Sequence, residues 1–197
     1  GGSDFDLQVQ RLREANVDAI VHWGNARESA LVLNHIRKLG MKQPYFTSDR
    51  SVSKEFTDLA GANAAGVISG YPWNPDRKDP HLAEFRKEFK ARFHDEPDTY
   101  AAHGYDGMNM LLWATNNAGL NRAKIRDLIA TRSTPWPGVT GDIPLSSAMD
   151  DMGDVFLARF DKDRWTYHSR EELQIPRGYI PTRERVSRGL ETASTIK

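Results

Sequence analysis

The spacing of apolar side chains along the chain changes several times, and it begins with a helical period. Residues 4–16 place apolar side chains three or four positions apart, which predicts an amphipathic helix with Ser3 positioned as its cap. The following segment, 18–23, is a short apolar run typical of a strand buried on both faces. Residues 27–39 return to helical spacing, and Gly40 is the expected stop.

The alternation of short apolar runs with helical segments continues as far as residue 71. Residues 44–48 and 66–71 predict a second and a third strand, with a short helix over 49–60 between them. Strand, helix and strand at this spacing imply right-handed crossovers, which place the strands side by side in parallel. The predicted fold class is therefore α/β, with a parallel sheet flanked by helices.

A proline-rich segment, residues 72–80, has no apolar period and predicts a linker between two units. The pattern after it predicts three helices, over 81–93, 99–118 and 121–131. The expected caps of the second and third helices are Asp98 and Asn121, and the expected stop of the second is Gly119.

The last third of the chain changes character again. Residues 135–142 form a turn-rich segment, and residues 154–168 alternate around a polar turn, which predicts a β-hairpin. Beyond residue 176 the chain is polar and rich in arginine and glutamate. The expected divisions are a first α/β segment, a linker, a helical segment, a hairpin and a polar tail, at 1–71, 72–80, 81–150, 151–175 and 176–197.

Charge and composition exclude several classes of function. The chain has 27 lysines and arginines and 27 aspartates and glutamates, so it lacks the basic surplus that binding to nucleic acid requires. No apolar run approaches the roughly 18–20 residues that span a bilayer, and no signal peptide opens the chain. Cysteine is absent, which excludes disulfides and cysteine nucleophiles. From the lack of a signal peptide in this sequence we expect either a cytosolic protein or a processed or truncated product.

Polar side chains follow the predicted parallel strands at their carboxyl ends, where open α/β sheets collect their ligands. Trp23 and Asn25 follow the first strand, and Ser48 and Asp49 follow the second. Asp49 is compatible with two roles, a helix cap or a carboxylate that holds an ammonium group. Asn25 likewise could cap a helix or offer its amide to a ligand, and Trp23 could pack against the neighbouring helix.

Evidence for catalysis is weak in this sequence. The six histidines are scattered without the spacing of metal ligands, so we expect no metal site. Neither a Gly-x-Ser-x-Gly elbow nor a phosphate-binding glycine loop is present, and no cofactor is expected. Gly104 and Gly107 lie in the second predicted helix, where we expect them to permit close helix packing. Asp150 and Asp151 lie in a loop and are expected to be solvated.

Several segments, taken together in order and spacing, resemble the type I periplasmic solute-binding proteins of the leucine/isoleucine/valine-binding family. The resemblance covers roughly residues 4–165. The segments that carry it are Asp4-Phe5, NVDA at 16–19, IRKLG at 36–40, NAAGV at 63–67, YAAHGYD at 100–106, NAG at 117–119 and GVTG at 138–141.

This resemblance implies a Rossmann-like, two-lobed clamshell that closes on a small solute and delivers it to a membrane permease. Residues 1–71 and the hairpin would belong to the second lobe, and residues 78–150 to the first. The first lobe's N-terminal units have no counterpart here, so the chain resembles a C-terminal portion of a receptor. A self-associating truncated chain is the expected consequence, because apolar helix faces would be left uncovered.

By position, the resemblance places Asp49 where such receptors hold an α-ammonium group, and Tyr100 at a pocket-lining aromatic near the hinge. Asn25 falls in the wall of the second lobe, and Trp23 and Ser48 are added as candidate ligand contacts because they follow the same two strands. This chain departs from its relatives at three positions: Asp49 is shorter than their glutamate, Asn25 replaces a tyrosine, and Arg50 replaces a small residue.

The favoured function is thus a non-enzymatic, periplasmic or extracellular receptor of an ABC importer, with a solute and a permease as partners. The alternatives are a ligand-sensing domain of the same fold in a signalling protein and a cytosolic α/β enzyme. The sensor requires an output domain elsewhere in the gene, and the enzyme requires convergent acids, bases or nucleophiles. An amino acid, an amide, a urea-like compound and an aromatic acid are all compatible solutes.

Overall fold

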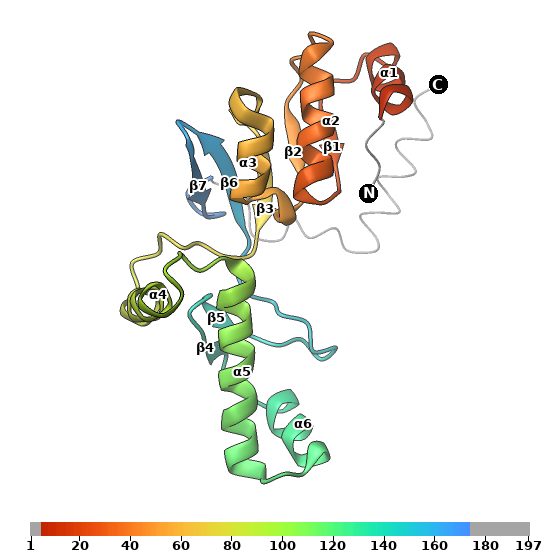
Figure 1. Cartoon of the computed structure of the whole chain (residues 1–197). Coiled ribbons are helices and arrows are strands. Elements are labelled where there is room, and N and C mark those ends of the chain that lie inside the picture. The colour runs from red at the N-terminus through yellow and green to blue at the C-terminus, as the bar shows by residue number, and fades with distance from the viewer. Residues whose placement is uncertain (1–4, 174–197) are drawn as a thin grey trace, which may run out of the picture.

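A computed structural model describes residues 5–173, which form a sheet unit and a helical unit (Figure 1). The sheet unit comprises residues 5–71 and 156–168, and the helical unit comprises residues 80–143. In the sheet unit the elements are α1 (Asp6–Glu14), β1 (Ile20–His22), α2 (Ala26–Lys38), β2 (Tyr45–Thr47), η1 (Asp49–Ser51), α3 (Lys54–Ala60), η2 (Gly61–Ala64), β3 (Ile68–Tyr71), β6 (Phe156–Asp161) and β7 (Arg164–His168). In the helical unit they are α4 (Pro80–Phe93), α5 (Thr99–Ala118), α6 (Arg122–Ala130), β4 (Trp136–Pro137) and β5 (Asp142–Ile143).

The central sheet has five strands in the order β1-β2-β3-β6-β7. The first three are parallel, with His22 opposite Thr47 and Phe46 opposite Ile68, as the repeated strand–helix pattern predicts. β6 is antiparallel to β3, and β7 is antiparallel to β6. The predicted hairpin therefore forms and extends the sheet beyond β3.

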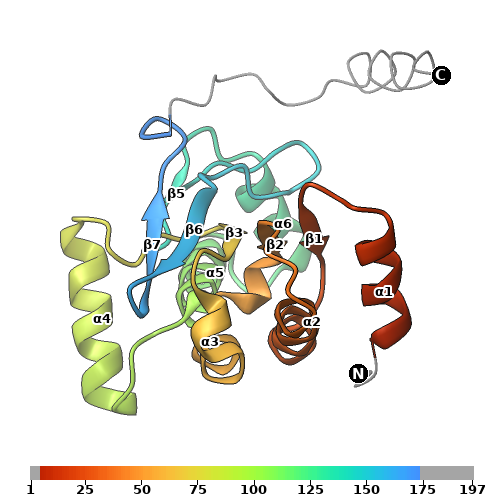
Figure 2. The same cartoon turned by 90° about the horizontal axis from the view of Figure 1, so that it is seen from above.

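One face of the sheet is covered by α2 and α3, which lie side by side against it (Figure 2). The apolar stripe of α2 provides much of this core, because Ala30, Leu33 and Ile36 are fully buried. Phe56 of α3 and Tyr45 of β2 belong to the same buried cluster. This packing fixes the position of β1 and β2, and with it the loops that follow them.

The segment after β3 leads from the sheet unit into the helical unit, and the segment before β6 leads back. The long helix α5 extends away from the sheet (Figure 1). As the sequence predicts, Asp98 and Asn121 cap α5 and α6 by accepting hydrogen bonds from Ala101 N and Lys124 N. Gly119 follows α5 with a positive φ of 67°, a conformation that glycine adopts without strain. Trp73 of the linker is buried and donates from Nε1 to Val139 O at 3.3 Å.

Several predictions require correction. The helix expected over 49–60 is broken, because η1 ends at Ser51 and a new helix starts at Lys54 with Ser53 as its N-cap. The turn-rich segment 135–142 contains β4 and the first residue of β5, and these two short strands pair antiparallel. Ser3, the expected cap of the first helix, and the tail at 176–197 lie outside the described residues.

The two glycines of α5 do not serve the role that the sequence suggested. A Cβ atom added at Gly104 or at Gly107 would have no other atom within 4 Å. Close packing against another helix of the described chain is therefore not their function.

Among residues 5–173, none of the helices combines the length and the apolar character that a membrane span needs.

Candidate functional site

Two loops meet at the carboxyl edge of the parallel strands. One joins β1 to α2 and carries Trp23 and Asn25; the other joins β2 to η1 and carries Ser48 and Asp49. Because β1 and β2 are parallel, both loops lie at the same edge of the sheet, as predicted. They are joined directly, since Ser48 Oγ donates a hydrogen bond of 2.5 Å to the carbonyl oxygen of Gly24.

Asn25 occupies the N-cap position of α2 but does not cap the helix with its side chain. Its Oδ1 instead accepts a hydrogen bond of 2.8 Å from Nη1 of Arg50, in η1. The interpretation of Asn25 as a side-chain cap is therefore wrong. The contact with Arg50 connects the two loops a second time and fixes the orientation of the Asn25 amide.

Asp49 is half-buried and begins η1, immediately after the second loop. It does not cap the following helix: the cap of α3 is Ser53, whose Oγ accepts from Phe56 N at 3.3 Å. Within residues 5–173 the Asp49 carboxylate accepts no hydrogen bond and forms no ion pair. Its interpretation as a helix cap is thus wrong, while its role as a ligand contact stays a prediction.

A buried hydroxyl network supports the two loops from beneath. Ser29 Oγ lies 3.0 Å from His22 Nδ1 and accepts from Thr47 Oγ1 at 3.3 Å. Thr47 Oγ1 also lies 2.8 Å from Ser51 Oγ, and the Tyr45 hydroxyl donates to Ser29 O at 3.1 Å. These bonds connect β1, α2, β2 and η1, so the loops rest on a layer with little freedom to rearrange.

His22 is the imidazole of this network. Burial lowers the pKa of His22, and the negative charge of Glu28 opposes that shift. The imidazole stacks on Tyr45, with ring centroids 6.2 Å apart, and lies directly below Gly24. A Cβ atom added at Gly24 would come 2.5 Å from Cε1 of His22, so any larger residue there would have to displace the imidazole.

The edge with Asp49 faces the first turn of α5. Tyr71, at the end of β3, is 4% exposed, and burial raises the pKa of Tyr71 to about 12, against a hydrogen bond with Thr99 that lowers it. The charges of Asp98 and Asp49 act on Tyr71 as well and raise this pKa further. Asp49 is thus within electrostatic reach of Tyr71, which contacts Thr99 of α5.

Trp23 and Tyr100, the two aromatic candidates, are exposed. Trp23 is 81% exposed, so the interpretation that it packs against the neighbouring helix is wrong. Tyr100 lies in the first turn of α5 and is 63% exposed. Large aromatic side chains that stay in solvent at the edge of a binding site are typical contacts for a ligand or a second domain.

The apolar pattern did not reveal the buried carboxylate of Asp106, which organises the helical unit. This carboxylate is 2% exposed and accepts hydrogen bonds from Val139 N, Thr140 N and Thr140 Oγ1 at 2.8, 2.9 and 2.7 Å. Gly138 is required beside it, since a Cβ atom there would lie 2.7 Å from Cγ of Asp106. The signal was present as an acidic residue in a helix and a GVTG turn, but nothing in their spacing connects them.

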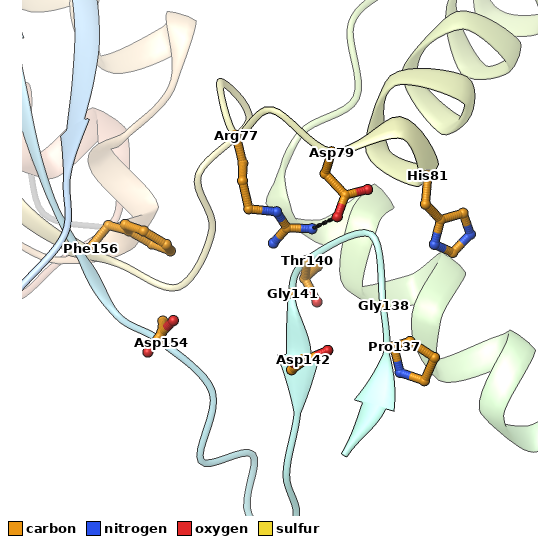
Figure 3. Close-up of a pocket in the computed structure, with 10 residues that line it drawn as sticks. All are labelled: Arg77, Asp79, His81, Pro137, Gly138, Thr140, Gly141, Asp142, Asp154 and Phe156. Carbon is orange, nitrogen blue, oxygen red and sulfur yellow. Dashed lines mark hydrogen bonds and ion pairs between the residues drawn. The ribbon is translucent and has the colours of Figure 1, made fainter. Parts of the chain in front are cut away.

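A hollow of about 380 Å³ lies where the linker, the β4–β5 turn and the start of β6 meet (Figure 3). Arg77 Nη2 reaches Asp79 at 3.2 Å and the carbonyl oxygen of Val139 at 3.4 Å, which ties the linker to the turn. None of the five candidate residues lines this hollow. Its lining residues are Arg77, Asp79, His81, Pro137, Gly138, Thr140, Gly141, Asp142, Asp154 and Phe156.

Metal chemistry finds no support in the described part of the chain. No group of three or more histidine, aspartate or glutamate side chains there is arranged to hold a metal ion. The candidate residues, with Arg50, offer a carboxylate, an amide, a guanidinium group and two exposed aromatic rings. Such groups bind and orient a polar organic molecule.

Comparison with known sequences identifies the family. Residues 1–162 match the family model described as "Periplasmic binding protein". The chain belongs to this family. Its sequence is 30% identical over 167 residues to the "Leu/Ile/Val-binding protein homolog 2" of Brucella abortus (strain 2308), covering 84% of this chain and 43% of that relative.

Solved structures of periplasmic binding proteins share the fold. The leucine-binding protein LivK from Thermotoga maritima superposes with a TM-score of 0.79 at 25% identity, over 86% of this chain and 49% of that one. LivJ from Streptococcus pneumoniae, solved in complex with isoleucine, gives a TM-score of 0.76 at 22% identity and the same coverage. The chain thus spans less than half the length of these relatives.

Proposed function

We propose that this chain is the C-terminal part of a periplasmic solute receptor of an ABC importer, and that its solute is an amino acid. The observation that carries the proposal is Asp49, a carboxylate without a partner in the described chain at the ligand-collecting edge of the sheet. A charge-assisted hydrogen bond to an ammonium group is the interaction that such a carboxylate makes best.

The arrangement of the two units supports a clamshell in this proposal. The sheet unit contributes Asn25, Ser48 and Asp49, and the helical unit contributes Tyr100 from the first turn of α5. The chain passes between the units after β3 and again before β6, so two connecting segments join them. We assign the sheet unit to one lobe and the helical unit to the other, with the solute between them.

The remaining parts of the proposal follow from the same role. A receptor of this kind does not transform its solute. Its partners are the solute and a permease in the membrane, and its compartment is the periplasm. Self-association of the isolated chain belongs to the proposal as well, because apolar side chains of α5 are exposed in the described chain.

Substitution of Asp49 in the longer receptor that the relatives' lengths imply tests this function. Asp49→Asn should weaken binding of an amino acid by about 1.5–3 kcal/mol, because the hydrogen bond to the ammonium loses its charge. Calorimetry with a panel of amino acids measures the change.

The matched control is Asp18→Asn, an exposed aspartate at the amino end of β1, which should leave the affinity unchanged. Deaminated analogues of the same solutes should not lose affinity in Asp49→Asn, because they have no ammonium group to pair with the carboxylate. Equal affinities of the Asp49→Asn and unsubstituted receptors for every amino acid would exclude Asp49 as the ammonium contact.

A further inference from the structure

We propose that Arg50, oriented by Asn25, forms a carboxylate-binding subsite beside Asp49, and that the solute is an amino acid whose side chain ends in a carboxylate. The inference rests on the proposed function and narrows its solute class. It assigns Arg50 as the residue that selects acidic over aliphatic amino acids.

Arg50 is a cation without a carboxylate partner in the described chain. Four arginines of the described chain do pair with a carboxylate: Arg77 with Asp79, Arg86 with Glu96, Arg126 with Asp127 and Arg159 with Asp161. The contact that the described residues make with the Arg50 guanidinium is instead the neutral Oδ1 of Asn25. Asp49 adjoins it in sequence, yet the two side chains form no ion pair.

The geometry leaves most of the guanidinium available. Arginine has five N–H donors in a planar fork, and Nη1 of Arg50 donates one hydrogen bond, to Asn25 at 2.8 Å. That bond holds the side chain across the two loops, so a carboxylate ligand meets an ordered fork. The amide nitrogen of Asn25 adds further donors on the same edge of the sheet.

The Asp49 carboxylate and the Arg50 guanidinium together favour a solute that has both an ammonium group and a carboxylate. Consecutive Cα atoms are about 3.8 Å apart, so Asp49 and Arg50 present an anion and a cation from neighbouring positions. Asp49 suits the ammonium group, and Arg50 suits a carboxylate at the other end of a short side chain.

An aliphatic side chain would fit this edge poorly. A pocket that closes on its solute excludes water, and a guanidinium left there without an anion carries a large desolvation penalty. A solute carboxylate removes that penalty and gains a bidentate ion pair in a medium of lower dielectric constant. The Arg50–Asn25 contact therefore favours glutamate or aspartate over leucine.

Calorimetry on the longer receptor with glutamate, glutamine and leucine tests the inference. We expect glutamate to bind more tightly than leucine, and Arg50→Met to weaken glutamate binding by about 10- to 100-fold while leucine binding does not weaken and gains affinity as the unpaired cation is removed. Arg50→Lys should keep part of the preference, because it keeps the charge and loses the fork. Arg13→Met, an exposed arginine on α1, is the matched control.

Two results would overturn the inference. One is tighter binding of leucine than of glutamate by the unsubstituted receptor. The other is an equal loss for glutamate and leucine in Arg50→Met with an unchanged thermal unfolding midpoint, which would assign Arg50 to the carboxylate that all amino acids share. In both cases, weaker amino-acid binding by Asp49→Asn would still support the proposed receptor function. If no amino acid bound to the longer receptor, both the receptor function and the Arg50 subsite would be refuted.

Discussion

His22 lies beneath the loop that carries Trp23 and Asn25 and belongs to the hydrogen-bond network that supports it. Its Nδ1 is 3.0 Å from Ser29 Oγ, and its ring supports Gly24 from below. Burial lowers the pKa of His22, so the folded chain favours the neutral imidazole. A proton added there would introduce a charge below the candidate site.

The linkage between His22 and stability gives a prediction with a defined sign. The folded chain binds this proton less readily than the unfolded chain, whose pKa is near the ordinary value of 6.5. The stabilising contribution is complete above that value and is lost as the pH falls through it toward the lowered pKa. In urea unfolding, the wild type should therefore lose more free energy of unfolding than His22→Asn between about pH 7.5 and 5.5.

The exposed histidine His94 provides the control for that experiment, since His94→Asn makes the same chemical change at the end of α4. Parallel pH profiles for wild type and His22→Asn would contradict the account of the buried network.

At the scale of elements, the helical unit depends on the contact between α5 and the β4–β5 turn. Asp106 accepts three hydrogen bonds from Val139 and Thr140, and the carbonyl oxygen of Val139 in turn accepts from Trp73 and Arg77 of the linker. The turn thus connects the long helix to the segment that joins the two units.

A pair of glycine substitutions separates this contact from general effects on α5. Gly138→Ala places Cβ against the Asp106 carboxylate and should destabilise the chain by about 1–3 kcal/mol. Gly104→Ala meets no atom within 4 Å and should stabilise the helix by roughly 0.5–1 kcal/mol. Chemical denaturation of both variants measures the difference, and a harmless Gly138→Ala would refute the close contact.

The sequence predicted the parallel strands correctly but missed the break between η1 and α3 and the contact of Asp106, each for a physical reason. The parallel order of β1, β2 and β3 followed from local apolar periods, which each segment carries by itself. The break between η1 and α3 was missed because the sequence over 49–60 satisfies a helical period throughout. The Asp106 contact joins positions 33 and 34 residues apart, and a local period contains no information about such a pair.

In the candidate site, too, the backbone arrangement was predictable from the sequence and the side-chain contacts were not. The shared edge of Asn25 and Asp49 was predictable, because parallel strands place their carboxyl ends together. The bond from Arg50 to Asn25 was not, since it depends on side-chain conformations in two loops. That bond also decided against the capping role that the sequence allowed for Asn25.

At the scale of the whole molecule, both units expose apolar side chains that a globular chain of this size would normally cover. They lie on α5 and at the β1 edge of the sheet, and they include Val21, Trp23, Tyr100, Met108, Leu111 and Leu112. Exposed apolar surface of this kind favours association with another surface.

We therefore expect the isolated chain to self-associate. Light scattering over a range of concentrations should show a mass that rises with concentration. Leu111→Gln and Leu112→Gln in combination should reduce that rise, whereas Leu7→Gln on α1, also exposed, is the control. A concentration-independent monomer would contradict this expectation.

The most direct test of the account is a comparison of solute binding by this chain alone and by the longer receptor. A solute held between two lobes loses its water only when both close on it, and each hydrogen bond then contributes more. Calorimetry with a panel of amino acids should therefore detect binding to the longer receptor, abolished or weakened by Asp49→Asn, and little or none to the isolated chain. Micromolar binding by the isolated chain as a clean monomer would contradict the two-lobed account.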